Sequence, residues 1–205
     1  MLLALALHLN VAIMPAPDYR GSLIDRVIEE TGQRVSAGDS VTALHSLEAF
    51  RHEVADSSRL MYETGLVHRL LGNNNRAEPL FIGATSSDPN LAAAWYDLGE
   101  IYLIRGELED AMVAFSNASD LTEEHPSGWA GPYRMAEVAG LQNDAVRFEQ
   151  SLEQAIERGF PLSDVIAGDE NWGSFFEERD LGDVLMRIIS VYGFPSVLES
   201  WQLDQ

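Results

Sequence analysis

The fold is decided by residues 95–118, which read WYDLGEIYLIRGELEDAMVAFSNA. Two segments with a helical spacing of apolar residues flank Gly106, and glycine adopts the left-handed backbone that a tight turn between helices requires. Glu107 follows, where an acidic side chain suits the N-terminus of a helix. Ala111 is small enough for two helices to approach closely, and Phe115, one turn later, fills the space beside them. The stretch therefore predicts two antiparallel helices that meet at Gly106.

The same pattern recurs along the chain with a period of 34 residues. An internal period of this length is the signature of stacked helical hairpins. The turn position holds Gly38, Gly72, Gly106 and Gly140, and five residues later stand Ala43, Ala77, Ala111 and Ala145. We expect each of these Gly residues to lie in a turn between two antiparallel helices. The predicted helix pairs are 24–36 with 40–53, 58–71 with 74–86, 92–105 with 108–121, and 126–139 with 142–157.

The third repeat carries the most specific motif. It reads Trp-x2-Leu-Gly-x2-Tyr and then Ala-x3-Phe-x2-Ala, at Trp95, Leu98, Gly99, Tyr102, Ala111, Phe115 and Ala118. At every one of these positions the chain resembles the tetratricopeptide repeat family. The second repeat keeps Gly65, Ala77 and Phe81. In the fourth, Tyr133 stands at the small-residue position, and Pro132 is expected to interrupt the first helix.

The resemblance implies an all-α fold in which antiparallel helix hairpins form a right-handed superhelical stack, a tetratricopeptide-like α-solenoid of about four repeats. The expected domains are a possible signal peptide or N-terminal helix over 1–17, the repeat array over 18–160, and a helical cap over 161–205. Within the cap, apolar residues from Phe175 to Ile189 recur at helical spacing. We expect this segment to cover the apolar end of the last hairpin.

Composition and charge exclude several classes of protein. The chain has 33 acidic and 13 basic residues, a formal net charge of −20, so we expect no nucleic-acid partner. It has no Cys, which excludes disulfides, Cys-ligated zinc and Cys nucleophiles. Every basic residue is Arg, so mechanisms that need a phosphate-binding or Schiff-base Lys are excluded as well.

The amino-terminal residues 1–16 are apolar and uncharged, and they read MLLALALHLNVAIMPA. The stretch is shorter than the roughly 20 residues that span a bilayer, so we expect no transmembrane span. It suits the apolar region of a secretory signal, which favours an exported or periplasmic protein. The absence of a preceding Arg or Lys, together with His8 and Asn10, favours an N-terminal helix and a cytoplasmic protein instead. Both interpretations stay open.

The sequence contains no recognisable catalytic constellation. His45, Glu48 and His52 have a spacing that could hold a metal ion on one helical face, but the repeat register places the buried side of that helix elsewhere. No His-Glu-x2-His, Gly-x-Ser-x-Gly or Gly-rich phosphate-binding motif occurs. We therefore expect no catalytic residue, no metal and no cofactor, and we interpret the chain as not an enzyme.

The candidate binding residues follow from the resemblance, because the first helix of each hairpin lines the concave surface of such arrays. Tyr62 and Tyr96 are 34 residues apart, so they hold equivalent places in neighbouring repeats. Tyr and Arg together suit peptide binding, and scarce Arg residues in an acidic chain favour a ligand with carboxylates. The predicted groove residues are Arg59, Tyr62, Arg69, Tyr96, Glu100 and Arg134.

The predicted function is non-catalytic binding of a protein or peptide partner of unknown identity in the concave groove of the short repeat array, within a larger assembly. Some tetratricopeptide domains hold the C-terminal carboxylate of a chaperone with a clamp that includes Lys, and the absence of Lys argues against that role. Family habit would place an exported member among the assembly factors of a bacterial envelope. Two alternatives stay open: a self-associating module that uses the exposed end of the array or the tail from Phe175 to Ile189, and a regulatory domain of an enzyme system.

Overall fold

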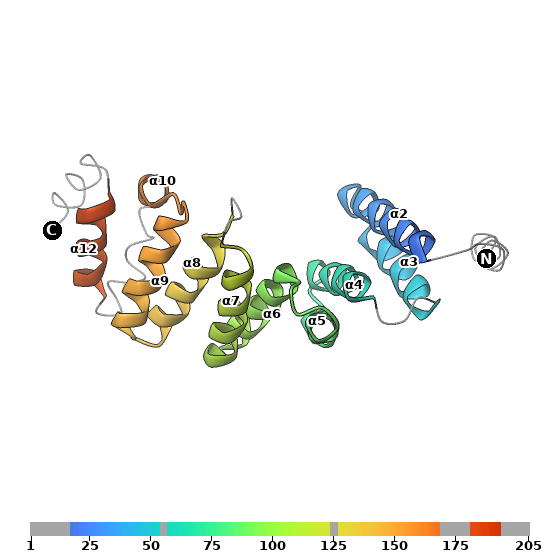
Figure 1. Ribbon diagram of the computed structural model, residues 1–205, viewed down its shortest axis with the longest axis horizontal. Helices are drawn as coiled ribbons and strands as arrows, with labels where there is room; N and C mark the ends of the chain where they lie inside the picture. The colour runs from blue at the N-terminus through green and yellow to red at the C-terminus, as the bar shows by residue number, and fades with distance from the viewer. Residues whose placement is uncertain (1–16, 54–56, 124–126, 169–180, 194–205) are drawn as a thin grey trace. The chain divides into compact units, whose positions relative to one another are not determined.

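The computed structural model of the protein describes residues 17–53, 57–123, 127–168 and 181–193 (Figure 1). Every regular element in these ranges is a helix, which confirms the predicted all-α class. The helices are α2 (Pro17–Ser36), α3 (Ser40–Glu53), α4 (Ser58–Leu70), α5 (Asn74–Ser87), α6 (Ala92–Arg105), α7 (Leu108–Leu121), α8 (Ala130–Leu141), α9 (Ala145–Glu157), α10 (Leu162–Gly168) and α12 (Gly182–Tyr192). The bounds of α6 and α7 match the prediction at both ends.

Contacts within the chain divide it into two compact units, and unit 1 is Met1–Ser87. It contains two hairpins, α2 with α3 and α4 with α5. The chain turns through left-handed backbone at Gly38 (φ +83°) and Gly72 (φ +76°), as predicted. Leu47 and Leu60, neither of them exposed, belong to one apolar core that joins α3 to α4.

The close approach of the two helices in a hairpin depends on a Gly in the first helix. A Cβ atom on Gly65 would lie 2.6 Å from the ring of Phe81, and one on Gly99 would lie 2.7 Å from the ring of Phe115. Both rings are fully buried. The small residue and the aromatic residue of the motif are therefore in direct contact, which explains why the motif requires both.

Unit 2, Asp88–Gln205, contains the hairpins α6 with α7 and α8 with α9, followed by α10 and α12. The α6–α7 turn is at Gly106 (φ +74°). Helix α12 packs along α9, and Leu185 and Ile189 share a core with Phe148 and Leu152 of α9. The amphipathic pattern of the tail thus produces a helix whose apolar side covers the last hairpin.

The fourth turn is not where the period placed it. Gly140 lies inside α8, and Asn143 takes the left-handed backbone instead (φ +54°). The N–H of Asp144 donates to the carbonyl of Ala139 at 2.9 Å, the same six-residue closure that ends α4 and α6. The prediction for Gly140 is therefore wrong, because Asn tolerates this backbone and allows the turn to come three residues later, at Asn143.

This shift of three residues corrects the whole fourth repeat. Phe148, and not Ala145, is the fourth residue of α9 and packs in the core with no exposed surface. Ala136 is the buried small residue of α8, so Tyr133 does not occupy that position. Pro132 is the third residue of α8 and does not interrupt it, because an N–H in the first turn has no partner within the helix.

Several predictions fall on residues outside the described ranges. The export signal at 1–16 and the apolar residues Phe175 and Phe176 are among them. The domain boundaries at 17 and 160 stay predictions. Among the described helices, none combines the length and the apolar character that crossing a membrane requires.

Candidate binding faces on the first helices

The first helices of unit 2, α6 and α8, bring four polar side chains together. Nε of Arg134 lies 2.8 Å from Oε1 of Glu100 and donates to the hydroxyl of Tyr96 at 3.3 Å. Nη2 of Arg134 donates to the other oxygen of Glu100 at 3.3 Å. On α8 itself, Nη1 donates to Oε2 of Glu137 at 2.6 Å. Three of the predicted groove residues therefore meet, and together with Glu137 they form what we call the Arg134 cluster.

The Arg134 cluster carries one positive and two negative charges at the edge of solvent. The side chains of Arg134, Glu100 and Glu137 are 30%, 15% and 22% exposed. Burial by itself would lower the pKa of Arg134, but its bonds to Glu137 and Tyr96 and the charge of Glu100 hold that pKa above its ordinary value. A ligand carboxylate would have to compete with two carboxylates of the chain, which differs from the expectation of an anion-seeking Arg.

The two predicted tyrosines are each held by an aromatic ring of their own hairpin. The Tyr62 ring lies 5.8 Å from that of Phe81, and the Tyr96 ring lies 5.5 Å from that of Phe115 in an edge arrangement. Burial raises the pKa of the Tyr96 hydroxyl, and the hydrogen bond from Arg134 opposes this rise. Both rings are thus fixed in position while part of each remains at the surface.

A third tyrosine belongs to this series, and sequence reasoning missed it. Tyr133 lies ten residues before the turn residue of its hairpin, as Tyr62 and Tyr96 do. Its ring stacks on Phe160 with centroids 4.5 Å apart, and Trp129 packs against the same Phe160 ring at 5.5 Å. The pair Asn143-Asp144, a left-handed turn residue followed by a helix cap, was the signal that could have corrected the register.

In unit 1, the predicted cations lie on α4. Arg59 forms an ion pair with Asp25 of α2, 34 residues earlier, and more than half of each side chain is exposed. Burial raises the pKa of Glu63, one turn further along α4, and the charge of Arg59 partly offsets this. Arg69 is half-buried and makes its contacts within the protein. Because Tyr62 and Tyr96 belong to different units, a single groove that joins them stays a prediction.

Glu48, one of the three residues considered for metal binding, contacts a residue of the next helix. Oε1 of Glu48 lies 3.3 Å from Nε2 of His68, which is only 3% exposed. His45 and His52 are both exposed on the surface of α3. In the described part of the chain, no group of three or more His, Asp or Glu residues is arranged to hold a metal ion. The Glu48–His68 pair therefore joins α3 to α4.

Comparison with known proteins shows which repeat family these hairpins are similar to. Residues 62–128 match the sequence model described as tetratricopeptide repeat. The chain is 32% identical over 83 residues to tetratricopeptide repeat protein 37 of Xenopus laevis, covering 40% of this chain and 5% of that protein. It is also 32% identical over 87 residues to the formate-dependent nitrite reductase complex bifunctional subunit NrfFG of Haemophilus influenzae, covering 42% and 20%.

A solved structure agrees over a longer span. MamA from Desulfovibrio magneticus RS-1, residues 41 to the end, superposes with a TM-score of 0.65 at 15% identity, covering 87% of this chain and 96% of that one. At this identity the likeness concerns the fold alone. This chain spans no more than about a fifth of the length of the two curated relatives. Together these findings confirm the resemblance stated from the sequence.

Proposed function

Because the chain is a tetratricopeptide-like repeat protein, we propose that it is a non-catalytic scaffold whose first helices hold a peptide segment of a partner protein in a larger assembly. The fold is that of protein-interaction scaffolds, and proteins built from these repeats are in general non-catalytic. One relative in sequence carries the name of a subunit of a reductase complex. That name supports a role in assembly without identifying the partner.

The observation that carries the proposal is the Arg134 cluster. Partly exposed ion pairs contribute little to folding, typically about 0–1 kcal/mol, so stability alone gives a weak reason for four such side chains to converge. The convergence does hold the Tyr96 ring and the Arg134 guanidinium in fixed positions at the surface. Preordered Tyr and Arg side chains bind at a low entropic cost, and they dominate the energy of many interfaces.

The charges of the cluster define the ligand more closely. Glu100 and Glu137 together outweigh Arg134 by one negative charge. A peptide that brings a cation or a hydrogen-bond donor gains from both carboxylates, whereas an acidic peptide meets repulsion. We therefore expect a neutral or basic segment at this face of unit 2.

The test is affinity capture from the cells in which the protein occurs, followed by titration with the purified partner. The wild type, Tyr96→Ala and Glu100→Gln are compared with Val113→Ala, a control on the exposed surface of the second helix α7, where Val113 is 60% exposed. Loss of one anchor should weaken binding about tenfold or more, while the control binds like the wild type. Circular dichroism and melting temperature verify that each variant is folded.

Three results would contradict the proposal. Equal affinity of Tyr96→Ala, Glu100→Gln and the wild type would exclude this face as the binding site. Sedimentation showing only self-association, unaffected by both substitutions, would favour a self-associating module. A measurable turnover by the purified protein would show that the chain is an enzyme.

A further inference from the structure

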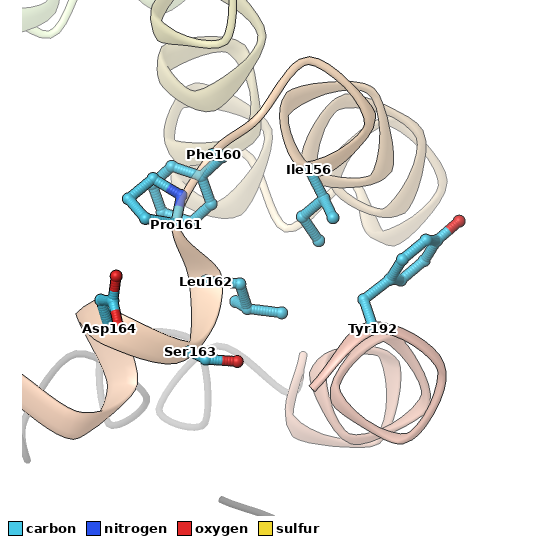
Figure 2. A pocket seen from close by; sticks show the side chains of 7 residues that line it. All are labelled: Ile156, Phe160, Pro161, Leu162, Ser163, Asp164 and Tyr192. Carbon is cyan, nitrogen blue, oxygen red and sulfur yellow. The ribbon is translucent and has the colours of Figure 1, made fainter. Parts of the chain in front are cut away.

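A separate hollow lies at the carboxyl end of unit 2. It has a volume of about 220 Å³ and lies where the end of α9, the start of α10 and the end of α12 approach one another. Figure 2 shows Ile156, Leu162 and the Tyr192 ring converging on it from three sides. The remaining lining residues are Phe160, Pro161, Ser163 and Asp164. We call this hollow the α9–α12 pocket; none of its lining residues belongs to the Arg134 cluster.

The size of the α9–α12 pocket limits what it can hold. Pockets for drug-sized ligands and cofactors usually measure about 300–1,000 Å³, so this one is too small for most of them. Its walls are mainly apolar and include Ile156, Phe160 and Leu162. A single large apolar side chain of another protein fits these properties, because a concave apolar wall gains most from one anchor residue.

The rim of the pocket is acidic. Asp164 lines it directly. Glu153 and Glu157 are four residues apart on α9, the helix that contributes Ile156, so they lie on one side of that helix. Partial desolvation, followed by the charges of these two Glu residues, raises the pKa of the Tyr192 hydroxyl, which is consistent with their closeness to that ring.

The carboxylates of this rim are not neutralised by the Arg residues that surround them. Arg158 donates to the carbonyl and hydroxyl oxygens of Ser119, at 2.9 and 3.0 Å. Arg187 pairs with Glu149 on the far part of α9. In the described ranges, no ion pair joins Glu153, Glu157 or Asp164 to a basic residue. Asp164 in the lining and the two Glu residues that act on Tyr192 therefore keep their charge available to a ligand.

We propose that the α9–α12 pocket is a second docking site, which takes one large apolar side chain from a partner segment whose neighbouring residues are basic. Charge complementarity selects the segment, since the rim carries three negative charges and repels acidic chains. The apolar wall then selects the anchor residue. This inference stands independently of the function proposed for the first helices, because it uses other residues at the other end of unit 2.

The experiment uses the full chain and synthetic peptides. The probe is a fluorescein-labelled peptide of Gly and Lys with one central Phe, and fluorescence anisotropy at two salt concentrations measures its binding. Matched peptides replace the central Phe by Ser, or every Lys by Glu. We expect the Ser peptide to bind about fivefold more weakly and the Glu peptide not to bind measurably.

Two pairs of protein variants localise the binding. Tyr192→Ala removes part of the pocket wall, and Val191→Ala is its control on α12, since Val191 is 71% exposed and does not line the pocket. Glu153→Gln with Glu157→Gln removes two of the three negative charges of the rim. A double variant with the same change in net charge, Asp110→Asn with Asp120→Asn on the exposed surface of α7, is the control for it.

We expect Tyr192→Ala and the rim double variant each to weaken binding of the Phe peptide about fivefold, and both controls to bind like the wild type. Equal losses in the rim variant and its α7 control would show general attraction to an acidic protein and would overturn the proposal. An unchanged affinity of Tyr192→Ala would do the same. Sedimentation that reveals a dimer lost only in the pocket variants would assign the pocket to a second copy of this chain instead, and would also overturn it.

Discussion

Asn143 holds the same left-handed turn position in the fourth hairpin that Gly106 holds in the third, with φ values of +54° and +74°. The two residues end their first helices with the same closing hydrogen bonds, and yet they are 37 residues apart instead of 34. The period in the sequence and the period in the structure therefore diverge in the last repeat.

This relationship predicts opposite results for substitutions at the two turns. Gly106→Ala forces a Cβ atom into left-handed backbone and should lower the free energy of unfolding by about 1–2 kcal/mol. Asn143→Gly relieves a smaller strain and should leave stability unchanged or raise it by a few tenths of a kcal/mol. Urea unfolding followed by circular dichroism measures both. A destabilisation by Asn143→Gly as large as that by Gly106→Ala would contradict the turn assignment.

The contact between Gly99 and the Phe115 ring predicts a steric penalty that a second substitution relieves. Gly99→Ala places a Cβ atom 2.7 Å from the ring and should cost about 1–3 kcal/mol. Adding Phe115→Leu removes the clash, so the double variant should lose less than the sum of the two single losses. Strict additivity in a double-mutant cycle would show that the two residues do not meet.

Helix α12 should protect the last hairpin. Ile189 has no exposed surface, and Ile189→Ala should destabilise unit 2 by about 2–5 kcal/mol and speed amide exchange in α9. Val191→Ala on the exposed side of α12 is the control and should change neither. Unchanged exchange in α9 with Ile189→Ala would mean that α12 does not cover it in solution.

The half-buried Glu63 should make stability depend on pH. Burial raises its pKa in the folded protein, so folding favours the protonated form, and that contribution is lost as the pH rises through the raised pKa. Glu63→Gln, which resembles the protonated form, should therefore unfold at a higher urea concentration than the wild type at about pH 7. The difference should shrink toward about pH 4.

The exposed Glu30 on α2 provides the matched control for this pH dependence. Glu30→Gln removes one charge from the same unit without relieving burial, so it should show no comparable gain. A wild type that is more stable than Glu63→Gln at neutral pH would show that the attraction of Arg59 outweighs the cost of burial.

The sequence predicted a turn correctly where the backbone of that turn strongly restricts the residue type. Gly38, Gly72 and Gly106 could be placed because left-handed backbone selects Gly so strongly. The prediction of a turn at Gly140 was wrong because a turn also accepts Asn. The turn lies three residues later, and a Gly still stands at the position that the 34-residue period marks. Local rules identify a turn residue, but they do not detect a change in helix length.

Three of the six predicted groove residues meet in the Arg134 cluster, but the bonds between them could not be predicted. The residues Tyr96, Glu100 and Arg134 were chosen as one face because helical spacing fixes which side chains point together. The ion pair between Arg134 and Glu100 depends on how α8 packs against α6, and the 34-residue period of the sequence does not specify that packing. The α9–α12 pocket had no signal at all, since it forms between segments that do not repeat.

The two sides of α12 differ in what they expose to solvent. Its buried residues Leu185 and Ile189 share one apolar cluster with Phe148 and Leu152 of α9. Asp183 and Ser190, in contrast, are exposed. A protein that lost α12 would therefore present the apolar side of α9 to water and to other molecules, and a newly exposed apolar patch of this kind promotes aggregation.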